Sequence, residues 1–528
     1  TGVNQRLAEH LEAAPSQHLN RSQARAVALV TRHQRQVTLL QGPPGTGKTA
    51  TAIEVICTWL RAKKGPILAT AFSNKGVDNL AEGLWARGVN VLRLGSCGQD
   101  LPYSFDGQLQ ALGISKTGKG STRGAMRDVL GGVHAACATC IGAGMSMLEA
   151  AQFPFVVVDE AAQVIEPATL LPLSKGSVQI VMVGDHCQLP ATVLSQEAEH
   201  AGLGKSLFER MADSGTDVHM LSVQYRMHPV IAAFPSWRFY KGELRTGVHP
   251  EARPPLEGRD ELGSMAFVHV NAAEKGGQGH SKMNHAEAEC VRHVVEGLKC
   301  TLGDVGVITP YSAQIAAIRR TLRNVPNGRS VQVASVDGFQ GSEKEAIILS
   351  LVRSNPEGKL GFVADWRRLN VAVTRARRLL VLVGNLPTLC QNNLWHDFVG
   401  LNPEMRSFEW DGQALQPLSA EPEKLVLAAQ EGIRKKKIRL PEPAWEDMLP
   451  GTATPAVSSR APAPAPASAA KAEVRRSQPM HLPPVKRRQS PDRSEESAQK
   501  QVRRPVEDEA ELIVARGSGK SHAEAAKA

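Results

Sequence analysis

Hydrophobic residues between positions 20 and 400 occur in short continuous runs, which longer amphipathic stretches separate. The runs occupy residues 37–40, 66–69, 155–158 and 179–183, and later residues 305–308, 331–333, 346–349 and 379–383. Apolar, β-branched runs of this length predict strands that are buried on both faces. Their alternation with helical stretches predicts parallel sheets covered by helices. The chain is therefore expected to be α/β, with two lobes that divide between residues 212 and 213.

Other segments depart from this pattern. Residues 96–130 are rich in Gly, Ser and Lys and predict a short, loop-rich insertion. Residues 1–18 hold only one short amphipathic segment and predict a stalk-like remnant. Residues 401–450 form a C-terminal extension. Residues 451–528 contain no Phe, Trp or Tyr, so they cannot bury enough apolar surface to offset their chain entropy, and a disordered basic tail is expected.

Charge and cysteine usage narrow the class of protein. The net charge of +10 and the pI of about 9.2 suit a polyanionic partner, although a basic protein without such a partner fits equally well on charge alone. The eight Cys form no paired metal-binding pattern; Cys137 and Cys140 make one CxxC without a second pair. This usage favours the cytoplasm or nucleus. Neither a membrane-spanning run nor a signal peptide is visible, so no membrane role is expected.

A glycine-rich segment supplies the first candidate chemistry. It comprises Gly42, Pro43, Pro44, Gly45, Thr46, Gly47, Lys48 and Thr49. The segment follows a predicted strand and opens a helix, which is the setting that a P-loop requires. Backbone N–H groups and the helix N-terminus then surround phosphate oxygens. Lys48 is expected to reach the β and γ phosphates of ATP, and Thr49 to place its hydroxyl on Mg²⁺.

Two acids end the strand predicted at residues 155–158. Beside a P-loop, Asp159 is expected to hold Mg²⁺ and Glu160 to activate the attacking water. The alternative is a pair of solvated strand-end carboxylates without a role. Gln188 lies in the turn after the next strand. From that position it is expected to sense the γ-phosphate.

Four motifs in order along the chain resemble those of superfamily 1 helicases, in the branch of the nonsense-mediated-decay helicase and senataxin. They span residues 159–163, 224–229, 336–341 and 369–376. The resemblance covers about residues 18–400. It implies two tandem RecA-like P-loop NTPase lobes, at residues 19–212 and 213–400, with ATP and Mg²⁺ as cofactors.

The resemblance also implies roles around the nucleotide. Gln23 is expected to read the adenine edge, and Tyr225 to pack near the base. Glu343 is expected to bind the ribose. Arg226 and Arg375 are expected to act as arginine fingers, because a guanidinium is planar, always charged and bidentate. For each arginine, the alternative is an ordinary surface ion pair.

Single-stranded RNA or DNA is the implied partner. The residues expected to contact its backbone are Ser73, Asn74, Lys75 and Thr139 in the first lobe, and Thr309, Pro310, Tyr311 and Ser335 to Asp337 in the second. Small polar side chains and loop N–H groups suit phosphate contacts that carry no sequence information. Thr139 has a plain alternative, in which its hydroxyl merely caps a turn.

The sequence departs from the family at several places. Family members usually have Pro where Phe72 stands and Arg where Ser342 stands. Residues 1–18 are too few for the family's β-barrel, and the Cys/His-rich zinc domain of the decay helicase is not seen. These departures affect the expected binding and separation of nucleic-acid strands and the recruitment to decay factors, but not the expected phosphate chemistry.

The sequence therefore predicts a monomeric, ATP-dependent helicase or translocase, 5′→3′ as in the family, with RNA-processing factors as possible partners. A remodeller that translocates without unwinding is one alternative, and a DNA-repair or replication helicase of the same branch is another. A third is a non-catalytic scaffold that binds RNA and ATP as a switch. The retention of Lys48, Asp159 and Glu160 argues against the scaffold, because a decayed motor would be free to lose them.

Overall fold

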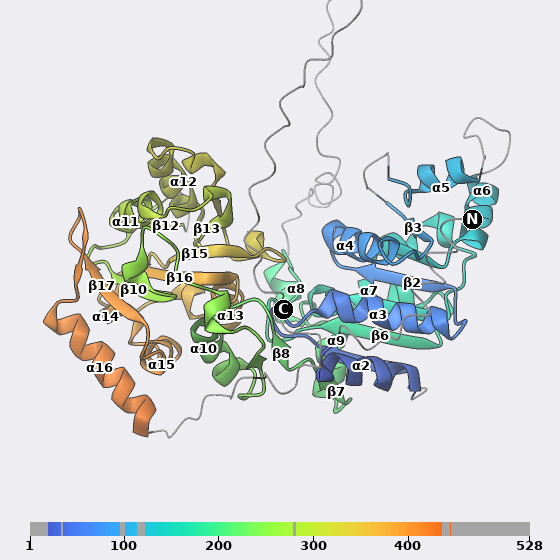
Figure 1. Ribbon diagram of the computed structural model, residues 1–528, viewed down its shortest axis with the longest axis horizontal. Coiled ribbons are helices and arrows are strands. Elements are labelled where there is room, and N and C mark those ends of the chain that lie inside the picture. Colours follow the sequence, from blue (N-terminus) through green and yellow to red (C-terminus); the bar gives the residue numbers. More distant parts are fainter. Residues whose placement is uncertain are drawn as a thin grey trace, which may run out of the picture. The chain divides into compact units, whose positions relative to one another are not determined.

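A computed structural model describes residues 19–32, 35–95, 101–112, 122–277, 281–435 and 444. Two seven-stranded sheets, each covered by helices, make up most of this part (Figure 1). All the strands predicted from the hydrophobic runs are present. The segments expected at residues 1–18 and 451–528 lie outside the described residues, as does most of residues 436–450.

The first sheet is entirely parallel and has the strand order β3-β4-β2-β5-β6-β1-β7. Its strands are β1 (Val37–Gln41), β2 (Ile67–Ala71), β3 (Val91–Arg93), β4 (Ala135–Thr139), β5 (Phe155–Asp159), β6 (Gln179–Gly184) and β7 (Val218–Met220). The accompanying helices are α2 (Arg21–Arg32), α3 (Lys48–Arg61), α4 (Asn74–Trp85), α5 (Phe105–Ala111), α6 (Thr122–Gly132), α7 (Glu166–Leu173), α8 (Gln196–His200) and α9 (Leu207–Asp213).

Alternation along the central strands explains why this sheet carries helices on both faces. Val157 belongs to the apolar cluster on one face, together with Trp59 of α3. Val156 and Val158 belong to the cluster on the other face, together with Phe208 of α9. All five side chains are fully buried, so a continuous apolar run is the sequence that this position requires.

The second sheet has the order β14-β13-β15-β16-β10-β17-β18 and is parallel except for its last pair. Its strands are β10 (Met265–His269), β13 (Val305–Ile308), β14 (Gln332–Ala334), β15 (Lys344–Ser350), β16 (Ala376–Gly384), β17 (Arg406–Trp410) and β18 (Leu415–Pro417). Its helices are α10 (Pro229–Phe239), α11 (His285–Gly297), α12 (Ser312–Thr321), α13 (Trp366–Val373), α14 (Leu386–Leu389), α15 (Asn393–Leu401) and α16 (Ala420–Lys435).

Two short ribbons complete the described strands. β8 (Val223–Gln224) pairs with β9 (Arg245–Thr246), and β11 (Lys275–Gly276) pairs with β12 (Lys282–Met283). Among the described residues, no helix is long and apolar enough to cross a membrane.

The structure differs from the predicted segments at three places. β7 pairs with β1 in the first sheet, so the first lobe continues past residue 212. The segment after residue 400 is no separate extension, because β17 pairs with β10 in the second sheet. α16 packs on α15 so closely that a Cβ at Gly400 would lie 2.3 Å from the Ala429 carbonyl oxygen. Of residues 96–130, the described ones, 101–112 and 122–130, hold α5 and most of α6 and are mainly helical.

Candidate nucleotide and nucleic-acid site

The predicted P-loop lies between β1 and α3, at the carboxyl edge of the first sheet. Gly45 and Gly47 have φ angles of 75° and 77°, a region that favours glycine. A Cβ on Gly47 would lie 2.7 Å from the Gln23 amide nitrogen, and one on Gly45 would lie 2.7 Å from the Arg226 Cβ. The glycines therefore let neighbouring side chains approach the loop closely.

Lys48 begins α3 and folds back over the loop. Its Nζ donates to the carbonyl oxygens of Gly42 and Pro43. Burial lowers the pKa of Lys48, an effect that the nearby Asp185 opposes. The ammonium is thus held by neutral carbonyls at the place where the motif expects phosphate oxygens.

The carboxyl end of β5 brings the two predicted acids to this loop. The Thr49 hydroxyl donates to Asp159 Oδ2 at 2.7 Å. Burial raises the pKa of Asp159, whereas the hydrogen bond from Thr49 lowers it. A carboxylate and a hydroxyl side by side are oxygen ligands of the kind that Mg²⁺ prefers, so these residues fit the predicted ion. Glu160 follows with a φ of 55°, unusual for a residue with a side chain.

The predicted adenine-reading residue is tied to the P-loop. Gln23 Nε2 donates to the Thr46 carbonyl oxygen at 3.0 Å, and the Asn20 backbone N–H donates to Gln23 Oε1 at 3.0 Å. Asn20 Nδ2 also donates to the Tyr225 hydroxyl at 2.9 Å. Asn20 therefore connects the two side chains expected around the base. Sequence reasoning missed its role, although it lies three residues before Gln23.

A buried polar network links the loop after β6 to the second lobe. Gln188 Nε2 donates to Asp185 Oδ2 at 2.6 Å, and Arg375 Nη2 donates to Gln188 Oε1 at 3.0 Å. The Tyr240 hydroxyl donates to Asp185 Oδ2 at 2.8 Å. Asn370 Nδ2 donates to the Tyr240 hydroxyl at 2.8 Å. Asp185, Tyr240 and Asn370 are absent from the sequence-predicted site because only the tertiary fold brings them together.

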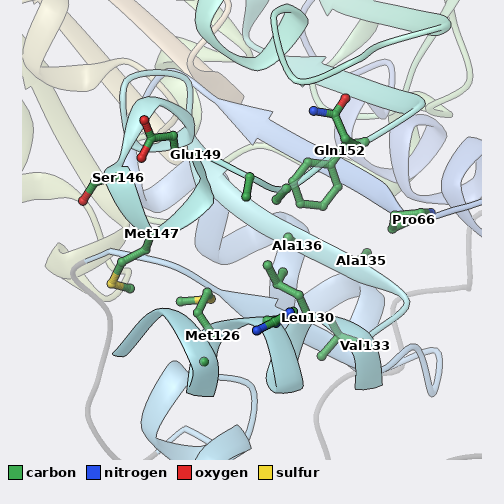
Figure 2. Close-up of a pocket in the computed structure, with 16 residues that line it drawn as sticks. Pro66, Met126, Leu130, Val133, Ala135, Ala136, Ser146, Met147, Glu149 and Gln152 are labelled. Atoms are coloured by element: carbon green, nitrogen blue, oxygen red, sulfur yellow. The ribbon is translucent and has the colours of Figure 1, made fainter. Parts of the chain in front are cut away.

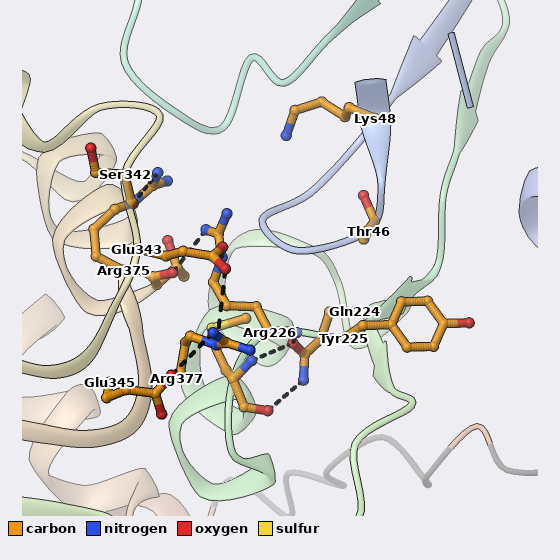
Figure 3. A network of polar contacts seen from close by, with 12 residues as sticks. Thr46, Lys48, Gln224, Tyr225, Arg226, Ser342, Glu343, Glu345, Arg375 and Arg377 are labelled. Atoms are coloured by element: carbon orange, nitrogen blue, oxygen red, sulfur yellow. Dashed lines mark hydrogen bonds and ion pairs between the residues drawn. The ribbon is translucent and has the colours of Figure 1, made fainter. Parts of the chain in front are cut away.

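Arg375 belongs to this network through Gln188, and Figure 3 shows it on the same side of Glu343 as the second predicted arginine finger, Arg226. Burial, with the second arginine adding to it, lowers the pKa of Arg375 to about 9, so the guanidinium remains a cation at neutral pH. Arg226 donates from Nε to Glu343 and from Nη1 to the Thr374 carbonyl oxygen, the latter at 3.1 Å. Glu343, expected at the ribose, is thus the ion-pair partner of Arg226 here, and its ribose contact stays a prediction.

The residues expected to contact nucleic acid in the first lobe lie at the end of β4 and just beyond the end of β2. These strands pair with Ala71 opposite Thr139. Ser73 caps α4 by accepting from the Gly76 N–H at 3.0 Å. Asn74 and Lys75 are exposed. The Thr139 hydroxyl accepts from the Gly142 N–H at 2.9 Å, which is the turn cap considered as its alternative.

Apolar side chains accompany this polar edge. Phe72 is 47% exposed and Ile141 is 70% exposed, each directly after or close to its strand end. Exposed aromatic faces beside phosphate-binding positions are the arrangement on which bases stack. Sequence comparison flagged Phe72 only as a departure from the family pattern.

The second lobe places its predicted contacts less uniformly. Asp337 is exposed, and Pro310 is partly exposed. Thr309 is fully buried, and its hydroxyl has no partner among the described residues. The Thr309 side chain is therefore inaccessible in this conformation, and its expected contact with a nucleic-acid strand stays a prediction. Tyr311 is also buried and lies within hydrogen-bond reach of Arg353, at 3.3 Å.

A separate cavity of about 610 Å³ has none of these residues in its lining (Figure 2). Apolar side chains of α6 and of residues 146–153 line much of it, including Met126, Leu130, Met147 and Phe153. Among the described residues, no cluster of His, Cys, Asp or Glu resembles a metal centre. Cys137 and Cys140 are buried thiols, and burial raises the pKa of each.

Two family models match, and both are described as an AAA domain. One matches residues 18–109 and 106–196, and the other matches residues 203–387. The regulator of nonsense transcripts 1 homolog of Neurospora crassa is 37% identical over 429 residues, which cover 73% of this chain and 39% of that protein. The ATP-dependent helicase NAM7 of Saccharomyces cerevisiae is 37% identical over 424 residues, which cover 72% of this chain and 43% of that protein. The chain thus spans less than half the length of these relatives.

Among solved structures, the arterivirus nonstructural protein 10 helicase aligns with a TM-score of 0.35 at 15% identity, covering 69% of this chain and 61% of that one.

Proposed function

Because the chain belongs to the helicase family of the regulators of nonsense transcripts 1, we propose that it is an ATP-driven motor that moves along single-stranded nucleic acid. The observation that carries the proposal is the contact between Arg375 and Gln188. It connects an arginine of the second lobe to a loop of the first, within reach of the P-loop elements. Closure around ATP is therefore able to control movement of the two lobes.

The residues divide the chemistry among them. Bound Mg²⁺ would neutralise charge on the phosphates, held by Thr49 and Asp159. Lys48 would exchange its carbonyl partners for phosphate oxygens. Glu160 would accept a proton from the attacking water. Arg226 and Arg375 would stabilise negative charge on the transferring phosphoryl group, and Gln188 would report its loss.

The strand would lie along the ends of β2 and β4 and continue onto the second lobe. Contacts from hydroxyls and backbone N–H groups follow the sugar-phosphate chain, so little sequence preference is expected. RNA and DNA both fit such contacts. A monomeric state, RNA-processing partners and a cytoplasmic or nuclear location stay predictions from the sequence.

Duplexes with a single-stranded tail on either the 5′ or the 3′ side test this function. We expect ATP-dependent strand release from the 5′-tailed duplex and none from the 3′-tailed one. A parallel assay uses a protein block on the same single strand. Removal of the block without strand release identifies a remodeller that translocates but does not unwind. Failure in both assays, with ATP hydrolysed, contradicts the proposed motor.

A further inference from the structure

A hydrogen bond joins the expected strand-binding edge to the expected catalytic base. The Ser73 hydroxyl donates to Glu160 Oε2 at 3.1 Å. The same oxygen of Ser73 accepts the Gly76 N–H, which caps α4. A hydroxyl has a single proton to give, and Ser73 gives it to Glu160.

The surroundings of Glu160 are shaped for this contact. A Cβ added to Gly76 would lie 2.8 Å from Glu160 Oε2 and 3.0 Å from the Ala71 Cβ. The missing side chain in the first turn of α4 therefore leaves room for the carboxylate. The left-handed backbone of Glu160 and the hydrogen bond from its N–H to Asp159 Oδ1, 2.9 Å, fix the direction in which that side chain leaves β5.

The position of Ser73 gives this contact a use. Ser73 starts the segment Ser73-Asn74-Lys75, which lies at the proposed strand-binding edge and has two exposed neighbours. A phosphate oxygen that approaches this segment is a second charged acceptor, and it competes with the Glu160 carboxylate for the single Ser73 proton. Once the Ser73 hydroxyl donates to the phosphate instead, the Glu160 carboxylate is no longer held by this hydrogen bond.

We propose that Ser73 is a positioning residue that restrains Glu160 until a single strand occupies the edge, and so couples strand binding to ATP hydrolysis. This inference rests on the proposed function. Ser73 does not act on ATP itself. It sets the fraction of molecules in which Glu160 is free to reach the attacking water.

Steady-state ATPase measurements on the full chain test the coupling, without nucleic acid and with oligo(U) or oligo(dT) titrated to saturation. In Ser73→Ala we expect basal kcat to rise roughly three- to tenfold, the change that corresponds to one hydrogen bond of ordinary net strength. The stimulation ratio should fall by a similar factor. The KM for ATP should stay unchanged because Ser73 does not contact the nucleotide site residues that bind phosphate.

Three further variants separate coupling from damage to the fold. Ser73→Thr keeps the hydroxyl and should restore the basal rate and the ratio. Gly76→Ala should crowd Glu160 off Ser73 and raise basal kcat in the same direction; in the double variant the two effects should not add. Ser195→Ala removes the cap of the exposed helix α8, which accepts from the Ala198 N–H at 3.2 Å, and should leave both rates at the wild-type level.

The outcomes distinguish this inference from the proposed function. If single strands stimulate the wild type but Ser73→Ala keeps the full stimulation ratio, or lowers basal kcat, the restraint does not exist. The same conclusion follows if Ser73→Thr fails to restore the ratio. If no single strand stimulates the wild type, the proposed function itself is wrong, and this inference falls with it.

Discussion

Arg375 and Gln188 are joined by a hydrogen bond of 3.0 Å although 187 residues separate them in the chain. Arg375 is 3% exposed, and Gln188 is 7% exposed. A cation is buried at such a place only when its partners compensate for the lost hydration. Here the compensation comes from Gln188 and from the Val371 carbonyl oxygen, which accepts from Arg375 Nε at 3.0 Å.

The two fingers are therefore expected to act on turnover more than on affinity. Arg375→Ala and Arg226→Ala should each slow hydrolysis of bound ATP by about a thousandfold. Equilibrium binding of ATP should fall much less. Single-turnover hydrolysis and nucleotide titration measure the two quantities. Arg292→Ala is the control, because Arg292 pairs with Glu289 and Glu296 on the surface of α11 and its loss should change neither. If affinity is lost while turnover of bound ATP is unchanged, the arginines are ground-state ligands only.

Glu160→Gln separates binding from chemistry. The amide keeps the shape of the side chain but cannot accept a proton, so hydrolysis should slow by about 10²- to 10⁴-fold. ATP and Mg²⁺ should still bind. Lys48→Ala should weaken nucleotide binding as well, because the phosphates lose a cation. Near-normal turnover in Glu160→Gln would show that another group activates the water.

Phe72→Ala should weaken binding of single strands. Stacking of one base on an aromatic ring contributes about 1–3 kcal/mol, or roughly a five- to 150-fold change in affinity. Phe72→Trp should retain the affinity. Fluorescence titration with labelled oligonucleotides, and with one carrying an abasic site, measures the effect. Val178→Ala is the control: Val178 is 65% exposed but directly precedes β6, at the edge opposite to the strand ends. Equal affinity in Phe72→Ala and Val178→Ala would remove Phe72 from the interface.

Glu287 predicts a pH dependence of stability. Its carboxyl is fully buried in α11 and accepts from the Ser350 hydroxyl at 2.7 Å and the Val352 N–H at 2.9 Å. Burial raises the pKa of Glu287 to about 8. The folded state thus favours the protonated acid, and the stability that this contributes is present below the unfolded pKa and is lost as pH rises from about 5 through 8.

The Gln side chain of Glu287→Gln cannot ionise. The difference in the free energy of unfolding, variant minus wild type, should therefore increase as pH rises. The gain between pH 5 and pH 9 should be on the order of a few kcal/mol. Urea denaturation followed by Trp fluorescence at several pH values measures it. Glu289→Gln, on the exposed face of α11 beside Arg292, should show no comparable trend. A constant difference between Glu287→Gln and the wild type would mean that Glu287 does not titrate in this range.

The geometry of the candidate nucleotide site was predictable to a large extent because its parts are local in sequence. The P-loop follows a strand, and the pair Thr49–Asp159 forms because parallel strands bring their carboxyl ends to one edge. The apolar runs of β5 and β16 are long enough to identify strands without tertiary information.

Other features depend on contacts that no local pattern encodes. β4 consists of small residues, Ala-Ala-Cys-Ala-Thr, with a single β-branched side chain at its last position. β7 has only three residues, and it is a strand because these residues pair with β1. Tyr240 and Asp185 lie 55 residues apart yet share a hydrogen bond. Thr309 belongs to a family motif, but the motif does not indicate that its side chain is fully buried.

The most direct test of the central claim is the rate of ATP hydrolysis with single-stranded RNA, with single-stranded DNA and with no nucleic acid, in the wild type and in Glu160→Gln. The account predicts slow hydrolysis alone, clear stimulation by at least one kind of single strand, and loss of both rates in Glu160→Gln. Hydrolysis that no single strand changes, or that persists in Glu160→Gln, would contradict a strand-coupled motor with its chemistry at the end of β5.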